Sequence, residues 1–213
     1  VNILATGADT YVWANNATNF VSNNPPINSD VTVNPPSTHL YFVTGSTNGC
    51  TDFDTLTVTV LPKIIANAGI NDTICIGESV GLTGFGASTH LWSPGSTLTS
   101  VNTGFTTATP LVSTNYVYTA SYNGLCPDTD TVRVVVNSLP IVFAGQDTTI
   151  DVEDVASLNG FTNATSFFWS NTGTLNCLNC LTPVATPTTT TTYVFSGENQ
   201  FGCENSDTVT VFV

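Results

Sequence analysis

The most informative pattern in the chain is an alternation of apolar and polar residues with a period of two. Residues 54–60 read Asp-Thr-Leu-Thr-Val-Thr-Val, and residues 207–213 read Asp-Thr-Val-Thr-Val-Phe-Val. This period is typical of a β-strand with one buried face. Residues 131–136 read Thr-Val-Arg-Val-Val-Val, which predicts a more continuously buried strand. No window has the spacing of about 3.6 residues that marks an amphipathic helix, so we expect an all-β protein.

The same residues recur in the same order three times along the chain. Trp13, Trp92 and Trp169 each end a similar segment, and their spacings are 79 and 77 residues. Each tryptophan is followed by a Pro and a Tyr six residues apart, then by Gly-Cys or Gly-Leu-Cys, then by Asp-Thr and an aliphatic residue. Recurrence at one long period predicts a linear array of homologous domains, each large enough to bury a small core of its own.

The register of the repeat predicts that the first unit lacks its opening strand. Alignment of Trp13 with Trp92 places Val1 opposite Val80, so nothing in the first unit corresponds to residues 66–79. The 213 residues are then either a window from a longer array or a subunit whose missing strand comes from elsewhere. We expect tandem Ig-like (PKD-like) β-sandwiches of about seven short strands each. The predicted units are residues 1–62, 63–139 and 140–213.

Composition restricts the location and the partners. Lys and Arg total 2 against 15 Asp and Glu, and charged residues make up only 8 % of the chain, compared with about 25 % in an ordinary domain. Nucleic acid and anionic membranes need clustered cations, so neither is an expected partner, and no direct membrane insertion is expected. Six cysteines without any methionine indicate a secreted protein with disulfides. The expected partners are neighbouring repeats of the same chain or neighbouring subunits, together with surface glycans or other cell-surface proteins.

The repeat suggests how the cysteines pair. Cys75 ends the opening strand of the second unit and Cys126 precedes its last strand, so we expect these two to bond, with about 4 kcal/mol of stabilisation from loop closure. The third unit has Asp151 where Cys75 would be, which leaves Cys203 without a partner in its unit. The first unit lacks that position together with its expected opening strand, which leaves Cys50 without a partner in its unit.

Cys177 and Cys180 form a Cys-x-x-Cys motif that has three interpretations. A zinc site needs four ligands, and the sequence offers no second such motif and no nearby pair of histidines. A redox site needs a helix N-terminus, which this region does not predict. A local disulfide that pins a surface loop is the favoured interpretation.

Several motifs together resemble those of a known family. They are Asp72-Thr73-Ile74-Cys75, Ala-Thr-Pro followed by a Thr-rich run into Tyr-Val-Tyr or Tyr-Val-Phe, and the closing Gly-Cys and Asp-Thr-Val. The combination resembles the PKD-like and Ig-like repeats of very large Bacteroidota cell-surface proteins, which include gliding-motility adhesins exported by type IX secretion. Better-known PKD domains continue from Trp into an acidic loop, whereas Trp92 here leads into Ser93 and Pro94. The resemblance implies an extracellular spacer, an adhesin or the body of a surface fibre.

The resemblance also implies O-glycosylation. Five segments match the Asp-Ser/Thr-aliphatic acceptor motif of Bacteroidota, and three of them occupy one position of the repeat. The candidate acceptors are Thr55, Thr73, Thr131, Thr148 and Thr208.

Recurring carboxylates are the best candidates for chemistry in this sequence. Asp52 with Asp54, and Asp128 with Asp130, resemble a glycosidase pair, but they recur just before the last strand of their units, as structural residues do. Closely spaced oxygen ligands suit Ca²⁺, so these four residues are the candidate calcium ligands, and solvated turns are the alternative. No cofactor is required by the sequence. Ser79 lies in a Gly-x-Ser-x-Gly motif between two strand patterns, where a nucleophile elbow would need a following helix.

The tryptophan and tyrosine positions are expected to form the core of each sandwich, whereas a carbohydrate platform would place aromatic side chains on an outer face. Three functions remain open. The chain is a spacer or fibre body of a surface protein, a glycan-binding module using a loop such as Asn171 to Pro183, or an accessory region of a secreted enzyme. A filament assembled by strand addition is a variant of the first function. The sequence predicts no catalytic residue.

Overall fold

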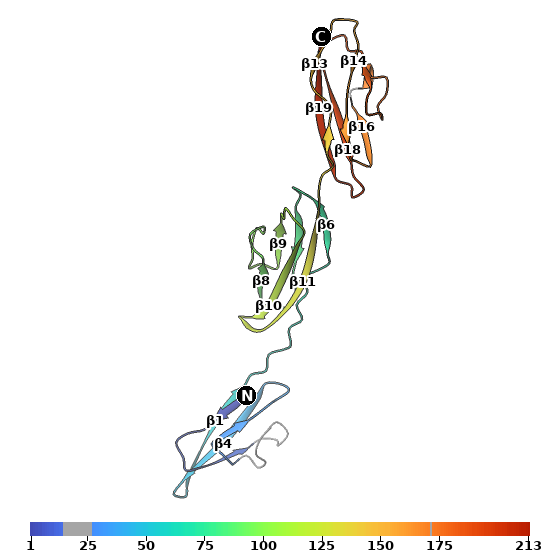
Figure 1. Ribbon diagram of the computed structural model, residues 1–213. Coiled ribbons are helices and arrows are strands. Elements are labelled where there is room, and N and C mark those ends of the chain that lie inside the picture. Colours follow the sequence, from blue (N-terminus) through green and yellow to red (C-terminus); the bar gives the residue numbers. More distant parts are fainter. Residues whose placement is uncertain (15–26, 171) are drawn as a thin grey trace. The chain divides into compact units, whose positions relative to one another are not determined.

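The protein consists almost entirely of β-strands, as the sequence pattern predicts (Figure 1). This computed structural model describes residues 1–14, 27–170 and 172–213. Within these ranges the only helical element is a 3-10 turn, η1 (Thr172–Thr174). The described residues hold no helix of the length and apolarity that a membrane span requires.

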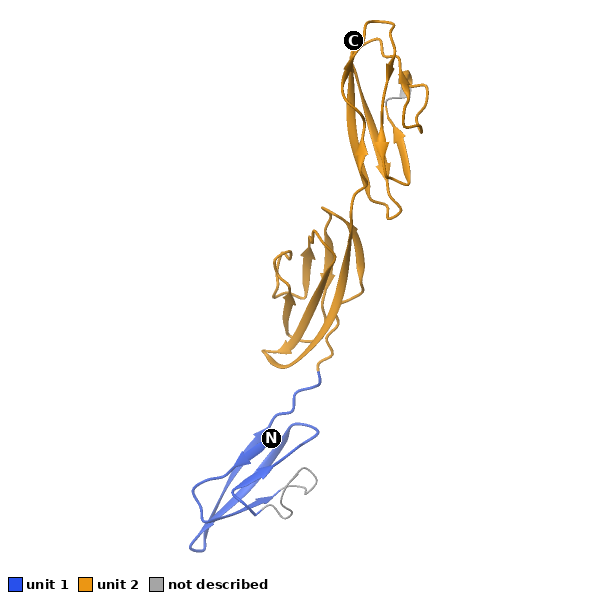
Figure 2. Cartoon of the chain, viewed as in Figure 1, with its two compact units in different colours: residues 1–63 blue, residues 64–213 orange. Residues whose placement is uncertain are grey.

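The chain divides into two compact units, residues 1–63 and 64–213 (Figure 2). Apolar side chains form one cluster in the first unit and two separate clusters in the second. We call the first unit the first repeat, and the two parts of the second unit, residues 64–139 and 140–213, the middle repeat and the last repeat. Each cluster lies between small sheets that pack face to face, as in an Ig-like sandwich.

The first repeat pairs a two-stranded sheet with a three-stranded one. The small sheet contains β1 (Asn2–Leu4) and β3 (Asp30–Thr32). The larger sheet has the order β2 (Thr10–Ala14), β4 (His39–Thr47) and β5 (Cys50–Val58), which leaves β5 at its edge.

The middle repeat has the same plan with one additional strand. Its small sheet pairs β7 (Val80–Thr83) with β9 (Phe105–Ala108). In its larger sheet the opening strand runs parallel to the last strand and covers the edge that is open in the first repeat. The order of this sheet is β6 (Asp72–Cys75), β11 (Leu125–Asn137), β10 (Thr114–Tyr122) and β8 (Thr89–Ser93).

The last repeat again places an opening strand beside the last strand, in parallel orientation. Two further pairs form the opposite side of the sandwich, β12 (Val142–Phe143) with β15 (Phe161–Thr162) and β14 (Ala156–Ser157) with β17 (Val184–Ala185). The order of the larger sheet is β13 (Thr148–Thr149), β19 (Glu204–Phe212), β18 (Thr191–Glu198) and β16 (Ser166–Trp169).

The repeated tryptophans and tyrosines form the cores, as the sequence predicts. Trp92 and Tyr116 are 1 % and 0 % exposed, and Trp169 and Tyr193 are equally buried. Each polar group still finds a partner, because the Trp92 Nε1–H donates to the carbonyl of Thr103 at 3.0 Å and the Tyr116 hydroxyl lies 2.6 Å from Thr97 Oγ1. A buried aromatic ring with a satisfied polar atom combines a large hydrophobic gain with a fixed orientation.

Trp92→Ala should destabilise the middle repeat by about 3–5 kcal/mol, because the cavity cannot be refilled by the short strands around it. Denaturant unfolding followed by circular dichroism measures this. Leu91 precedes Trp92 on β8 and is 48 % exposed, so Leu91→Ala is the matched control and should cost far less. Equal losses for the two variants would show that Trp92 does not carry the core.

Candidate functional site

A disulfide joins the middle repeat to the last repeat, and it contradicts the pairing expected from the sequence. Cys75 at the end of β6 bonds to Cys203, with Cα atoms 5.6 Å apart. The expected Cys75–Cys126 bond is therefore wrong, whereas Cys203, expected to lack a partner in its own repeat, bonds to a cysteine of the preceding one. Cys126 and Cys50 are free and exposed.

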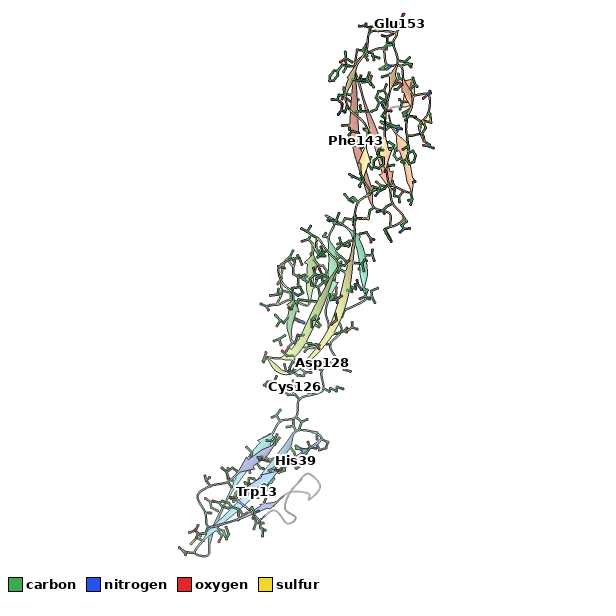
Figure 3. The ribbon with its side chains drawn as sticks, in the orientation of Figure 1. Trp13, His39, Cys126, Asp128, Phe143 and Glu153 are labelled. Carbon is green, nitrogen blue, oxygen red and sulfur yellow. A yellow bond between two sulfur atoms is a disulfide. The ribbon has the colours of Figure 1, made fainter. Side chains whose placement is uncertain are left out.

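The register of the parallel pair explains the correction. Cys75 lies opposite Asn137, the last residue of β11, whereas Cys126 is the second residue of the same strand. Eleven residues of extended strand separate these positions by roughly 36 Å at about 3.3 Å per residue, so no disulfide can span them. Figure 3 shows Cys126 together with Asp128 at the hairpin end of the middle repeat. Cys203 instead lies in the loop between β18 and β19 of the next repeat.

Cys177 and Cys180 bond to each other, as the sequence favours. Their loop lies against the core tryptophan of the last repeat. Trp169 donates its main-chain N–H to the carbonyl of Leu178 at 2.8 Å and its Nε1–H to that of Cys180 at 2.9 Å. The disulfide therefore fixes a loop whose carbonyls satisfy a buried indole.

Asp128 and Asp130 hold the opening segment of the middle repeat onto its last strand. The main-chain N–H groups of Ala66 and Ala68 donate to Asp128 Oδ2 and Asp130 Oδ2 at 2.8 and 2.9 Å. In the last repeat Ala144 donates in the same way to Asp207 Oδ2 at 2.9 Å. Hydrogen bonds from the Ala68 and Thr131 main chains hold the pKa of Asp130 below its usual value. The recurring carboxylate is thus a structural fastener.

The structure leaves calcium binding as a prediction. Among the described residues no three side chains of the His, Cys, Asp and Glu types form a group that could hold a metal ion. The oxygens of Asp128 and Asp130 that bond the opening segment are engaged by main-chain donors. Asp52 and Asp54 in the first repeat are exposed and bond, in the described part of the chain, only the N–H of the residue that follows each, at 2.9 and 2.7 Å.

The first repeat has a groove where the other two repeats hold their opening segment. Its volume is about 560 Å³. One wall is residues 4–8, the floor includes Trp13 and Val43, and the other wall is residues 50–56 of β5. Leu56 is 41 % exposed there, while Val132 and Val209 in the other two repeats are each 1 % exposed. The groove therefore exposes apolar surface that the other repeats bury.

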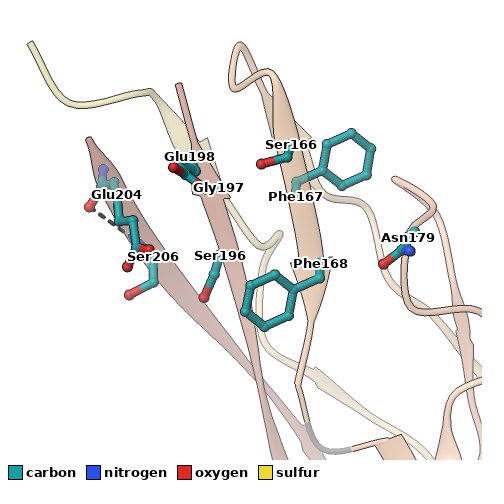
Figure 4. A pocket seen from close by; sticks show the side chains of 10 residues that line it. Ser166, Phe167, Phe168, Asn179, Ser196, Gly197, Glu198, Glu204 and Ser206 are labelled. Atoms are coloured by element: carbon teal, nitrogen blue, oxygen red, sulfur yellow. Dashed lines mark hydrogen bonds between the residues drawn. The ribbon is translucent and has the colours of Figure 1, made fainter. Parts of the chain in front are cut away.

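A second hollow lies on the outer face of the last repeat (Figure 4). It has a volume of about 590 Å³ and combines aromatic, amide and carboxylate groups from β16, β18, β19 and the loop after β16. Phe168 is 54 % exposed in it. Asn179 comes from the residue range 171–183 that the sequence singles out, and Glu198 and Glu204 face each other across β18 and β19.

The remaining candidate residues lie in surroundings that suit a structural role. Ser79 follows the turn between β6 and β7, so its motif has no helix after it. The His90 ring lies 2.6 Å from the Tyr118 hydroxyl, at Nδ1. Four of the five candidate glycan acceptors are exposed and Thr148 is half-buried, which leaves O-glycosylation as a prediction. The exposed four are Thr55, Thr73, Thr131 and Thr208.

The hydrogen bonds that Asp130 accepts predict how the stability of the middle repeat depends on pH. The pKa of Asp130 is lower in the folded state than in the unfolded state, where it is about 3.9. The ionised carboxylate therefore stabilises the fold above the unfolded pKa, and this stabilisation is lost as the pH falls through the folded pKa. Asp130→Asn should lower the melting temperature of the middle repeat at pH 7 and reduce its further fall between about pH 4 and pH 2. Calorimetry measures both. Asp54→Asn removes a carboxylate that holds no segment, so the melting temperature at pH 7 and its fall in acid should stay as in the wild type. If the melting temperatures of the wild type and of Asp130→Asn fell equally in acid, Asp130 would not have this stabilising role.

Comparisons with known proteins give only distant structural likenesses. No family model and no curated protein matches the sequence. Solved structures that resemble the chain include tandem Ig domains at low identity. Drosophila OTK extracellular domains 3–5 are 9 % identical with a TM-score of 0.38, covering 96 % of this chain and 85 % of that one. The titin I9–I11 tandem is 10 % identical with a TM-score of 0.40, covering 100 % and 91 %. The insect immune protein hemolin is 10 % identical with a TM-score of 0.42, covering 95 % and 67 %.

Proposed function

We propose that the chain is a structural repeat region of an extracellular surface protein, where it acts as a spacer or fibre body under tension. The disulfide between Cys75 and Cys203 carries this proposal, because it joins two successive repeats covalently. Polar contacts at the same joint support it. The Asn199 Nδ2–H donates to the carbonyl of Ser138, and the Asn205 Nδ2–H donates to that of Pro140, at 2.8 and 2.9 Å.

The position of the disulfide determines which residues bear tension. A pull on the two chain ends passes from the opening strand of the middle repeat through the sulfur atoms to Cys203, and then along β19. Residues 76–202 lie off this covalent path. Most of both cores is thereby protected from extension, which suits a spacer that must keep its length.

Extension of single molecules tests this directly. The disulfide spans a sequence separation of 128 residues, so the oxidised chain should withhold roughly 420–460 Å of contour length at about 3.3–3.6 Å per residue. Addition of reductant should release that length in atomic-force traces. Cys75→Ser should extend fully without reductant, whereas Cys126→Ser is the matched control and should behave as wild type. Equal contour lengths with and without reductant would reject the proposal.

The resemblance to Bacteroidota repeats supports a bacterial cell surface as the location, with export by type IX secretion and O-glycans on the exposed Asp-Thr segments. Glycans would lie on strand surfaces away from the cores, because the exposed acceptors point away from buried side chains. Calcium bound at Asp52, Asp54, Asp128 and Asp130 would neutralise part of the chain's net charge of −13.

The hollow on the last repeat favours glycan binding as a second candidate function. An exposed aromatic ring beside amide and carboxylate oxygens is the chemistry that a sugar ring contacts. Phe168→Ala should abolish retention of the chain on a glycan array if the hollow binds sugar. Phe201 is 58 % exposed in the same repeat and outside the hollow, so Phe201→Ala should have no effect. Retention that survives Phe168→Ala would place sugar binding elsewhere.

A further inference from the structure

The hollow on the outer face of the last repeat carries negative charge that no side chain of this repeat can neutralise. Glu198 and Glu204 both line it. All Lys, Arg and His residues of the protein precede residue 140, so the last repeat has no basic side chain. We propose, building on the glycan-binding candidate, that this hollow selects a sugar with a free, protonated amino group.

The register of the sheet places the two carboxylates directly opposite each other. Glu198 on β18 pairs with Glu204 on β19. Residues that pair in this way have Cβ atoms about 4.5–5.5 Å apart, and like charges at such positions destabilise a sheet. Among the described residues neither carboxylate has a hydrogen-bond donor or an ion-pair partner. A cation held between them would relieve a repulsion that the fold leaves in place.

The next row of the same sheet face supplies an aromatic surface. Phe168 pairs with Ser196, and Ser196 pairs with Ser206, two residues along the strands from the carboxylates, or about 7 Å. Phe168 is 54 % exposed, and its ring is directed toward Ser196 (Figure 4). An aromatic ring offers apolar contact area and attracts cations to its face. A sugar ring stacked on Phe168 can therefore direct an amino substituent toward the carboxylate pair, with the serine hydroxyl groups beside it.

The strands that carry the two glutamates are held in place, as a selective site requires. The carbonyl of Glu198 accepts two hydrogen bonds from Thr165, one from its main-chain N–H and one from its hydroxyl, both at 2.9 Å. In the loop that joins the two strands, Asn199 Oδ1 accepts the N–H of Cys203 at 3.1 Å. Cys203 is also fixed by its disulfide to the middle repeat. The spacing of the carboxylates is thus set before a ligand arrives.

The opposite border of the hollow is the loop after β16. Asn179 lies there between Cys177 and Cys180, whose disulfide closes the loop. The Asn179 amide adds an uncharged donor and acceptor. The lining therefore offers an aromatic face, neutral polar groups and two negative charges without any positive charge. This combination disfavours sugars with carboxylate or sulfate groups and favours an amino sugar.

Oligomers of glucosamine and of N-acetylglucosamine, equal in length, test the selectivity on the full oxidised chain. Acetylation removes the charge of the amine and leaves the sugar rings the same. Calorimetric titration in slightly acidic buffer of low ionic strength should show that the glucosamine oligomer binds about tenfold more tightly or better, because its hydrogen bonds to the carboxylates are charge-assisted. Added salt should reduce this difference, since exposed charges are screened.

Glutamine substitutions test the two carboxylates. Glu198→Gln and Glu204→Gln should each weaken binding of the glucosamine oligomer about tenfold and leave the affinity for the acetylated oligomer unchanged. Glu153→Gln is the matched control, because it removes an exposed carboxylate of the same repeat outside the hollow, and it should leave both affinities as in the wild type. Without ligand, Glu204→Gln should melt at no lower temperature than the wild type, since a like-charge pair is removed. Weaker binding would then not result from unfolding.

The outcomes separate the amine selectivity from glycan binding itself. Equal affinity for the two oligomers would overturn the selectivity and leave glycan binding by the hollow intact. Binding of the glucosamine oligomer that survives both glutamine substitutions and is lost in Phe168→Ala would have the same meaning. If no glycan of either kind bound the wild type, the glycan-binding candidate would fail and the selectivity with it.

Discussion

The hydrogen bond from a main-chain N–H of the opening segment to an aspartate of the last strand is the interaction on which the middle and last repeats depend. The opening segment has little regular pairing of its own, since β13 contains only two residues. The carboxylates of Asp130 and Asp207 hold it where its small side chains close the core. A charged acceptor is suited to this role because hydrogen bonds to ionised groups are stronger than those between neutral groups. Val132 and Val209, which follow these carboxylates by two residues, are each 1 % exposed.

Much of this architecture could be predicted from the sequence. Alternation with a period of two identified the strands, and recurrence of Trp and Tyr identified the cores, because both patterns reflect local geometry and burial. The bond between Cys177 and Cys180 could also be inferred, since two cysteines so close in sequence lie within reach of each other in a loop.

The pairing of Cys75 could not be found by treating each repeat as closed. The decisive fact is the parallel direction of β6 on β11, which places Cys75 at the far end of the sandwich from Cys126. Hydrophobic periodicity carries no information on strand direction. A signal was nevertheless present, because Cys203 and Cys126 occupy the same position of successive repeats, and Cys203 follows a repeat whose opening strand ends in Cys75. In the same way, the Asp-x-Asp pattern resembles a metal site until the donors opposite it are known.

The covalent ring closed by Cys75 and Cys203 also changes what a protease can do. A cut at any single peptide bond between residues 76 and 202 leaves both fragments attached through sulfur, so the polypeptide is nicked and not divided. The exposed loops of two repeats lie inside this ring, while the first repeat lies outside it. Such a chain would retain whatever is attached to its two ends after attack on those loops. In an environment rich in secreted proteases, the ring therefore confers durability of attachment that the stability of either core alone cannot provide.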